Sequence, residues 1–444
     1  MTCENNNINI TIIGGSRGLG KWIANELHKD NFNVKITSRN RSSGEKIAHK
    51  MGVKYDDDNI EAIADANIII FSVPIEYMVD TIKEVAPYAP KDSLLMDVTS
   101  VKTEPAEALS KYAPEDTYIL PCHPMFGPRI PSLDGQVVIL TPIEDRCRLW
   151  YDKIVYYLKN KDANLVISTP QEHDKIMSVV QGLTHFSYIS IASTIRRLGI
   201  SVKKSREFAS PVYSLMLDMI SRIVSQNPYL YYSIQKSNKQ TAISRKTLIE
   251  ESNRLAKLID DDMEEEFVYD MSESAKHLDE FEEALGRSDK AISVLTHDFN
   301  YIKESIGCEI GFEHQYSKKI HIGVVESVNA TTVTLRDLKN NRITLKISNI
   351  NILTENEIYE WKKNNLPIHE YDVSIIFPDT CSEDILLSMF SQIKPVIDVN
   401  IKDVYNGKQI DDGFMSITFH YSVFNSEERE VVEEYLRGIG GKIR

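Results

Sequence analysis

The chain has 444 residues, of which 42% are hydrophobic and 26% charged, and its formal net charge is −14. At roughly 150 residues per domain this length predicts about three domains, and the composition excludes disordered and collagen-like chains. The negative charge argues against nucleic acid as a partner, no apolar run reaches the roughly 18 residues of a membrane span, and the five scattered cysteines suit a cytoplasmic protein without disulfides or a cysteine zinc site.

Strand-like and helix-like segments alternate through residues 1–168. Apolar runs predict strands at 8–13, 34–37, 67–73, 94–98, 117–120 and 137–140, and apolar stripes predict helices at 21–29 and 45–51. The run at 67–73 is almost continuously apolar, which is typical of a strand buried on both faces of a sheet. This alternation predicts an α/β domain with a mostly parallel, doubly wound sheet.

A glycine-rich turn follows the first predicted strand. Gly15 and Gly20 fit the first and third positions of the G-x-G-x-x-G pattern, whereas Arg17 occupies the middle one, so we expect Gly18 to allow the close approach of a pyrophosphate. The simpler interpretation of such glycines is a flexible loop. Their place between a strand and a helix instead predicts a Rossmann-type dinucleotide-binding domain, with the turn residues Gly14, Gly15, Arg17, Gly18, Leu19 and Gly20.

The end of the second strand predicts which dinucleotide is bound. An acidic residue here binds the ribose hydroxyls of NAD, whereas arginine accommodates the 2′-phosphate of NADP. The sequence after Thr37 is Ser38-Arg39-Asn40-Arg41, without an acidic residue before Glu45. We therefore predict NADP as the preferred cofactor, held by Ser38, Arg39 and Arg41, with NAD as the alternative; the two arginines could otherwise be solvated loop charges.

Three further segments end strands where the sheet should meet the nicotinamide. Val73-Pro74 ends one strand, residues 97–102 (D-V-T-S-V-K) end the next, and residues 121–128 (P-C-H-P-M-F-G-P) end a third. Prolines on both sides of Cys122-His123 predict a stiff loop that holds the His123 imidazole in place. A lone histidine is more often structural than catalytic, but its position at this edge makes His123 a candidate catalytic residue.

Three motifs in this order, I-I-G-G-x-x-G-L-G, D-V-T-S-V-K and H-P-M-F-G-P, resemble the prephenate dehydrogenase family in its archaeal branch. The resemblance extends through about residue 305. It implies NAD(P)-dependent oxidative decarboxylation of prephenate to 4-hydroxyphenylpyruvate, in tyrosine biosynthesis. It also implies that residues 169–305 form an all-α domain that binds the substrate and pairs two subunits into a homodimer. Helices are expected at 171–198, 207–224, 244–258 and 278–285, and the acidic run at 260–266 as a solvated helix end without a metal.

The resemblance also implies roles for five residues. His123 matches a histidine that hydrogen-bonds the ring hydroxyl of the substrate, and it must be uncharged to accept the hydroxyl proton. Ser100 matches a serine near that histidine and the nicotinamide. His185 matches a substrate-binding histidine, Arg222 an arginine that holds a substrate carboxylate, and Tyr231 a further aromatic residue. The structural alternatives are a core histidine at 185, a surface arginine at 222 and a packed tyrosine at 231.

The C-terminal third has a different character. Short strands at 320–325, 332–335 and 342–345 predict a small β-barrel-like module over residues 306–356. Residues 368–444 follow the order β-α-β-β-α-β of a ferredoxin-like α+β domain, and residues 403–416 resemble the ferredoxin-fold anticodon-binding domain of the phenylalanyl-tRNA synthetase β chain. Acidic residues outnumber basic ones in residues 371–444, so we expect a regulatory or assembly role rather than RNA binding. An amino-acid-sensing module like the ACT domains is the alternative.

Two other functions stay open from the sequence. Arogenate dehydrogenase differs in substrate only by an amine in place of the side-chain keto group, and no sequence feature locates the acidic residue that would recognise it. A non-catalytic dinucleotide-binding regulator, with a C-terminal module that binds a partner, belongs to a different class. Reduction of a nicotinamide cofactor by prephenate separates the enzyme from the regulator.

Overall fold

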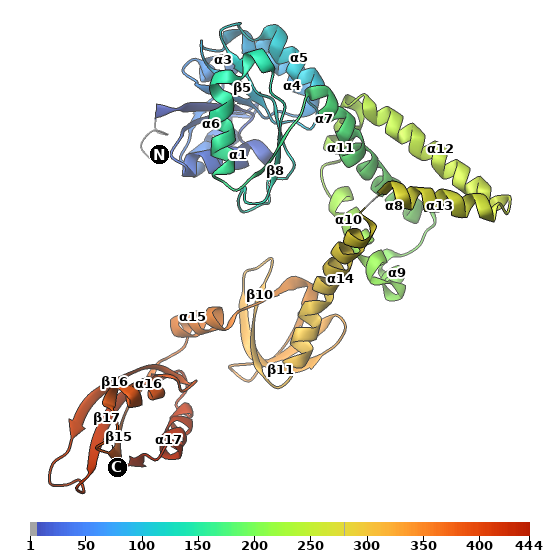
Figure 1. Cartoon of the computed structure of the whole chain (residues 1–444). Helices are drawn as coiled ribbons and strands as arrows, with labels where there is room; N and C mark the ends of the chain where they lie inside the picture. The colour runs from blue at the N-terminus through green and yellow to red at the C-terminus, as the bar shows by residue number, and fades with distance from the viewer. Residues whose placement is uncertain (1–6, 279) are drawn as a thin grey trace. The chain divides into compact units, whose positions relative to one another are not determined.

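The computed structural model describes residues 7–278 and 280–444, which form two compact units, Met1–Phe281 and Glu282–Arg444 (Figure 1). The first unit is built on a parallel sheet. Its six strands are β1 (Asn9–Ile13), β2 (Asn33–Thr37), β3 (Lys54–Asp56), β4 (Ile68–Phe71), β5 (Leu94–Asp97) and β6 (Tyr118–Ile119). They lie in the order β3-β2-β1-β4-β5-β6, and every pair is parallel. The strand order reverses between β1 and β4, which is where a doubly wound sheet opens a crevice at its carboxyl edge.

Helices cover both faces of this sheet, which confirms the predicted fold class. One face carries α1 (Gly18–Lys29), α2 (Arg41–Met51) and α6 (Arg148–Lys159), and the other carries α3 (Asn59–Ile63), α4 (Ile75–Val85) and α5 (Thr103–Tyr112). Side chains of alternate strand residues feed the two cores, because successive residues of a strand point to opposite faces. Ile12 and Ile36 pack beneath α1, whereas Ile13 and Ile69 pack beneath α4, and each such buried side chain contributes roughly 1.5–3 kcal/mol.

A second, three-stranded sheet carries the predicted His123 segment. It consists of β7 (Cys122–Pro124), β8 (Val137–Leu140) and β9 (Asn164–Ile167), with β7 antiparallel and β9 parallel to β8. The structure thus corrects two expectations, since residues 122–124 form a strand rather than a loop, and residues 137–140 lie outside the main sheet. Pairing of His123 with Ile139 fixes the histidine by backbone hydrogen bonds as well as by its prolines.

The helical part of the first unit begins with one long rod, as expected. It comprises α7 (Pro170–Met177), the π-helix η4 (Ser178–Leu183) and α8 (Thr184–Arg197). The helices that follow are α9 (Val202–Ser205), α10 (Pro211–Val224), α11 (Pro228–Ser237), α12 (Gln240–Asp260) and α13 (Glu264–Leu278). The predicted helix at 278–285 overlaps the last residue of α13 and the first residues of α14 (Phe281–Glu304), and residue 279 lies outside the described residues. The acidic run does lie at a turn between two helices.

The π-helix η4 packs closely against α12 and α11. A Cβ on Gly182 would lie 2.6 Å from Thr241 Cγ2 on α12, so only glycine lets the two helices approach this closely. The backbone of Gly182 accepts a hydrogen bond from Gln235 Nε2 of α11 at 2.7 Å. A π-turn widens the helix by one residue, and such turns are frequent at functional sites. Gln181 lies within this segment.

In the second unit, an antiparallel sheet follows α14. Its strands are β10 (Glu309–His314), β11 (Ile320–Val328), β12 (Thr332–Asp337), β13 (Arg342–Lys346) and β14 (Ile350–Ile352), in the order β13-β12-β11-β10-β14. Ile302 of α14 is fully buried in the core of this sheet, which explains why α14 groups with the β module rather than with the helices before it. The helix α15 (Glu355–Asn365) follows, begun by a capping box of Thr354 and Glu357.

The chain ends in an α+β module with the element order expected from the sequence. It contains β15 (His369–Pro378), α16 (Glu383–Ser391), β16 (Val396–Tyr405), β17 (Phe414–Val423), α17 (Glu428–Gly438) and β18 (Lys442–Ile443). The antiparallel strands lie in the order β16-β17-β15-β18. Both helices pack on one face, where Phe390 and Leu436 meet Ile417 and Phe419 of the central strand.

Candidate active site

The turn between β1 and α1 has the features of a pyrophosphate cradle. Arg17 precedes α1 without a side-chain capping hydrogen bond, so the N–H groups of the first turn stay available for an anion. Gly18 has φ +53° and open space where a Cβ would be, whereas a Cβ on Gly14 or Gly20 would lie within 3 Å of Ser72 atoms. The glycines therefore serve both purposes: close packing against the β4–α4 turn and an open backbone at Gly18. These residues fit a dinucleotide.

Val73 and Pro74 lie beside this turn. A Cβ on Gly14 would be 3.1 Å from Val73 Cγ1, and Pro74 is the residue before α4. Gly15 packs against Ile36 instead, so it supports the turn from below. The predicted pair thus lies at the carboxyl end of β4, on the cofactor side of the sheet.

The three residues predicted to choose the cofactor differ in what they contact. The Arg39 guanidinium lies over the Tyr77 ring, 4.9 Å from its centroid, and the Ser16 hydroxyl donates to Ser38 Oγ at 2.9 Å. Arg41 instead donates to Glu45 at 3.0 Å and to Asp57 at 2.9 Å. These two contacts raise the pKa of Arg41 above the ordinary value for arginine. Arg39 is therefore the better candidate for a phosphate, because Arg41 would have to leave two carboxylates.

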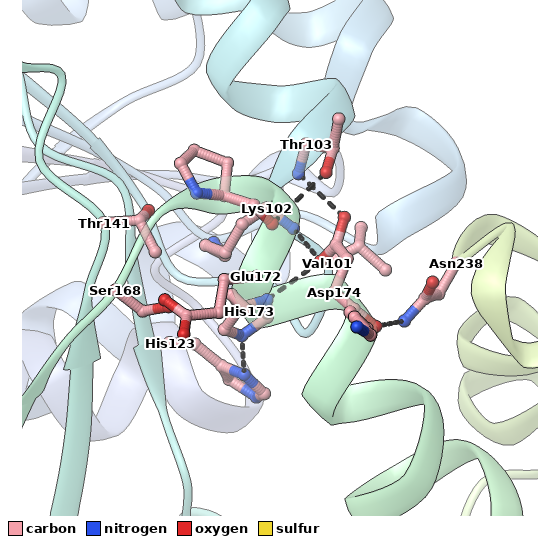
Figure 2. Close-up of polar contacts among 12 residues, drawn as sticks. Val101, Lys102, Thr103, His123, Thr141, Ser168, Glu172, His173, Asp174 and Asn238 are labelled. Carbon is pink, nitrogen blue, oxygen red and sulfur yellow. Dashed lines mark hydrogen bonds and ion pairs between the residues drawn. The ribbon is translucent and has the colours of Figure 1, made fainter.

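His123 lies at one end of a buried chain of polar side chains (Figure 2). Its side chain comes from β7, is only 3% exposed, and places Nδ1 2.8 Å from His173 Nε2. His173 Nδ1 in turn lies 2.8 Å from Asp174 Oδ1. Sequence analysis missed His173 and Asp174, the fourth and fifth residues of α7. The only signal was two adjacent polar residues near the start of a helix, which is also typical of an ordinary solvated helix end.

Asp174 connects this chain to the start of α5. Its Oδ1 accepts a hydrogen bond from the backbone N–H of Lys102 at 2.8 Å, and its Oδ2 accepts one from that of Thr103 at 2.9 Å. Burial opposes its ionisation, but the hydrogen bonds from His173 and Thr103 outweigh burial and lower the pKa of Asp174. Asn238 Nδ2 donates to the Asp174 carbonyl at 2.7 Å, so α7, α5 and the start of α12 meet at this residue.

Lys102 places a buried positive charge beside His123. Its side chain is fully buried, forms an ion pair with Asp97, and donates to the carbonyl of Cys122 at 2.8 Å. Burial, with a further contribution from the Lys102 charge, lowers the pKa of His123 well below its usual value of 6.5. The imidazole is therefore uncharged near neutral pH, as a proton acceptor must be.

Gln181 on the π-helix and His185 on α8 each have a buried polar atom without a partner in the described part of the chain. Gln181 Nε2 lies 3.3 Å from His123 Nε2. Gln181 Oε1 and His185 Nδ1 are both buried and have no hydrogen-bond partner among residues 7–278 and 280–444. Leaving such an atom unsatisfied costs about 1–3 kcal/mol, which is typical of a site that binds a polar ligand. Gln181 was noted from the sequence only as sharing a helix face with His185.

The remaining predicted residues are placed as follows. The His185 ring packs edge-on against Tyr231, with centroids 4.8 Å apart, and burial lowers the pKa of His185. Burial raises the pKa of Tyr231, and the positive charge of Arg222 opposes this shift, so Arg222 lies near the Tyr231 hydroxyl while it stays exposed to solvent. Ser100 is half-buried in the loop between β5 and α5, and no hydrogen bond joins it to His123 in the described part of the chain.

These features define a class: an oxidoreductase that binds a dinucleotide on a Rossmann-type sheet and holds a neutral histidine at the crevice. Comparison with known families is more specific. Residues 23–167 match the nucleotide-binding domain of prephenate dehydrogenase, and residues 169–273 match its dimerization domain. A probable arogenate/prephenate dehydrogenase from Methanocaldococcus jannaschii is 37% identical over 99% of both chains. The chain therefore belongs to the prephenate dehydrogenase family of NAD(P)-dependent oxidoreductases.

Other relatives resemble only part of the chain. The T-protein of Haemophilus influenzae is 31% identical over 51% of this chain and 55% of its own length. A crystal structure of prephenate dehydrogenase from Aquifex aeolicus covers 62% of this chain and 98% of its own, with 18% identity and a TM-score of 0.50, and it supports the fold alone. Within residues 7–278 and 280–444, no helix has the length and apolarity to cross a membrane.

Proposed function

We propose that this protein oxidises and decarboxylates prephenate to 4-hydroxyphenylpyruvate in tyrosine biosynthesis, with NADP preferred over NAD. The observation that carries the proposal is the buried, uncharged His123, whose Nε2 lies 3.3 Å from the Gln181 amino nitrogen, next to the unpartnered Gln181 Oε1. A histidine of this kind can take a proton from a ring hydroxyl but needs a substrate that supplies one. Prephenate and arogenate both do so, and the relative from Methanocaldococcus jannaschii is named for both.

The proposed reaction follows from where charge must move. His123 accepts the proton of the 4-hydroxyl at Nε2, which strengthens the electron donation of that oxygen to C4. A bound nicotinamide supplies the acceptor for the hydride from C4. As the ring carboxylate leaves as CO₂, its bonding electron pair completes the aromatic ring, which provides the driving force. The protein's own task is to orient the ring and to keep water from the imidazole.

Arg222, His185 and Tyr231 are proposed to hold the other end of the substrate. A guanidinium can bind a carboxylate through two parallel hydrogen bonds, which a lysine cannot do. Burial keeps His185 uncharged, so its unpartnered Nδ1 can hydrogen-bond a polar substrate group without adding charge. Tyr231 fixes the His185 ring by edge-on packing. Ser100 is proposed to lie near the nicotinamide, since it follows β5 at the carboxyl edge of the sheet.

We also propose that the protein is a homodimer formed through its helical region. Apolar side chains on these helices remain exposed within one chain, among them Val179, Val180, Val212, Ile243 and Ile249. Contiguous exposed apolar residues on helices are typical of a protein–protein contact. Light scattering on the purified full chain should give twice the 50.7 kDa of one subunit. A monomer at micromolar concentration would contradict this.

The substrate and cofactor are tested together in one assay. Purified protein is mixed with prephenate or arogenate and with NADP or NAD, and the absorbance of the reduced nicotinamide is followed. We expect the highest kcat/KM with prephenate and NADP. A higher value with arogenate would replace the substrate assignment, and no reduction in any of the four mixtures would favour the non-catalytic regulator.

A further inference from the structure

We propose that His173 and Asp174 act as positioning residues that set the tautomer of His123, leaving its Nε2 without a hydrogen and aimed at the substrate. Only the consequence of this tautomer, the transfer of a substrate proton to His123 Nε2, rests on the proposed function. The tautomer itself is a property of the protein without substrate. The argument follows the hydrogen-bond donors from the carboxylate outward.

Asp174 can only accept hydrogen bonds. Its pKa is lowered, so it is ionised, and two backbone N–H groups already donate to its two oxygens. The hydrogen between Asp174 Oδ1 and His173 Nδ1 therefore belongs to His173. In the neutral ring this leaves His173 Nε2 as an acceptor. The hydrogen across the 2.8 Å gap to His123 then belongs to His123 Nδ1, so His123 Nε2 keeps its lone pair.

A second contact leads to the same tautomer from the other side. Gln181 presents its amino group, which is only a donor, to His123 Nε2 at 3.3 Å. A hydrogen on that nitrogen would oppose the amino group. A chain in which His173 carries hydrogens on both nitrogens would reverse this, because His123 Nδ1 would then accept and Nε2 would carry a hydrogen that faces the Gln181 amino group. The Gln181 amino group is therefore compatible with the bare Nε2 that the Asp174 chain sets.

Burial makes this arrangement strict. His173 is 1% exposed and His123 is 3% exposed, so water cannot readily replace a missing partner. The chain is also anchored at its far end, because the two N–H groups that bind Asp174 belong to the start of α5. Lys102, from the same segment, donates to the carbonyl just before His123. The loop between β5 and α5 therefore fixes the histidine through its backbone and through its ring.

The test measures the tautomer directly, on the full-length protein without ligands. Solid-state NMR of protein labelled with ¹⁵N-histidine distinguishes a bare ring nitrogen from a protonated one, and the His123→Gln variant assigns the His123 signals. We expect a protonated Nδ1 and a bare Nε2 at pH 7.5. A protonated Nε2 on His123 in the wild-type protein would overturn the proposal, whatever the enzyme assays show.

The Asp174→Asn variant should invert the chain. The asparagine side chain has nearly the same shape, but its amino group can donate to His173 Nδ1, which moves the hydrogens onto His173 Nε2 and His123 Nε2. We expect kcat to fall by roughly 10²–10⁴-fold, with KM for substrate and cofactor within about threefold. The Glu172→Gln variant is the control, because Glu172 is exposed and accepts only from its neighbour Ser168; its tautomer and kcat should match the wild type.

Two variants at position 173 separate a role of His173 in positioning the His123 ring from a role in packing alone. In His173→Gln the side-chain carbonyl can still accept from His123 Nδ1, whereas in His173→Leu it cannot, so we expect the glutamine variant to keep the wild-type tautomer and clearly more activity. Equal kcat and an unchanged His123 tautomer in both variants would refute the role of His173. If wild-type and variant tautomers agree with expectation but neither prephenate nor arogenate is oxidised, the proposed function fails and the tautomer assignment stands.

Discussion

The charges around one imidazole decide what His123 can do. Lys102 and Asp97 form a fully buried ion pair next to it, and replacing either partner alone would leave a buried charge unpaired, at a cost of about 3–5 kcal/mol. Asp174, at the other end of the hydrogen-bonded chain, accepts hydrogen bonds from the backbone N–H groups of Lys102 and Thr103. Burial is the main reason that the pKa of His123 is low, and the positive charge of Lys102 lowers it further.

Replacing His123 should impair the reaction but not cofactor binding. In His123→Asn the amide cannot take the hydroxyl proton, so we expect kcat to fall by about 10²–10⁴-fold. The glycine turn lies on β1 and α1, away from β7, so the dissociation constant of NADP, measured by fluorescence titration, should change by less than about threefold. Turnover equal to that of the wild type would remove His123 from its catalytic role.

The lowered pKa of His123 predicts how stability depends on pH. When pH falls below about 6.5, the histidine of the unfolded chain binds a proton while the folded one does not. The contribution of His123 to the free energy of unfolding is therefore complete above pH 6.5. The free energy of unfolding should decrease as the pH falls from 6.5 to 5. His185 and His321, whose pKa values are also lowered by burial, add to the same effect.

Urea unfolding at pH 7.5 and pH 5 measures this decrease. The His123→Asn variant is the comparison, since it lacks the ionisable ring and should lose less stability than the wild type over the same interval. An equal loss in both proteins would show that His123 does not resist protonation in the folded state.

Arg39 should distinguish the two cofactors. In Arg39→Ala a charge-assisted hydrogen bond to the 2′-phosphate would be lost, at about 1.5–3 kcal/mol, so NADP should bind roughly 10- to 100-fold more weakly while NAD changes little. Arg41→Ala is the matched control, because Arg41 is already paired with Glu45 and Asp57. Equal weakening of NADP and NAD by Arg39→Ala would refute the phosphate assignment.

At the scale of helices and strands, periodicity predicted the central elements well. The continuous apolar run identified β4, and the alternation of β1, β2 and β5 placed the sheet. The start of α2 was predicted four residues late, because Asn40, whose side chain accepts from Ser43 N–H, begins the helix before its apolar stripe does. The short strand β7 was taken for a loop, because two prolines in or beside it suppress the strand pattern.

Tertiary contact explains what the sequence could not show. The π-turn depends on how closely α12 approaches Gly182, and nothing near Gly182 in the sequence encodes that distance. His173 became part of the site only because α7 lies against β7, fifty residues away in the chain. His123, Ser100 and Arg222 could be named from motifs, whereas Gln181, His173 and Asp174 required the fold.

The π-turn should be sensitive to a single methyl group. In Gly182→Ala the new Cβ would lie 2.6 Å from Thr241 Cγ2, and separating η4 from α12 should lower the free energy of unfolding by about 1–3 kcal/mol. Gly286→Ala is the control, because a Cβ there meets nothing within 4 Å on α14, and alanine should instead raise helix stability by up to about 1 kcal/mol. Denaturant titration compares the two; an unchanged Gly182→Ala protein would contradict the tight contact.

At the scale of the whole molecule, the two units carry different chemistry. The residues proposed for catalysis all lie in Met1–Phe281, while Glu282–Arg444 contains the β module and the terminal α+β module. On the face of that terminal sheet opposite its helices, Asp372 contacts His420 and Lys402, so these two basic side chains are already paired with a carboxylate. We therefore still expect a regulatory or assembly role for this module.

The terminal module should not bind RNA, despite its resemblance to an anticodon-binding domain. Its acidic composition gives no basic surface for a phosphate backbone. A gel-shift experiment with the full chain and bulk tRNA at about 150 mM salt should show no complex at micromolar protein. A complex that persists at this salt would overturn the prediction and would assign the module to RNA.

The position of Asp174 has a consequence for engineering. The two family domains meet at residues 167 and 169. The proposed base, His123, lies in the first domain, whereas His173 and Asp174, proposed to orient it, lie in the second. A chimera that joins the N-terminal part of one parent enzyme to the C-terminal part of another at this seam would combine a histidine with foreign neighbours. Such a chimera should keep its activity only when the crossover lies after Asp174, so that His123, His173 and Asp174 all come from the same parent.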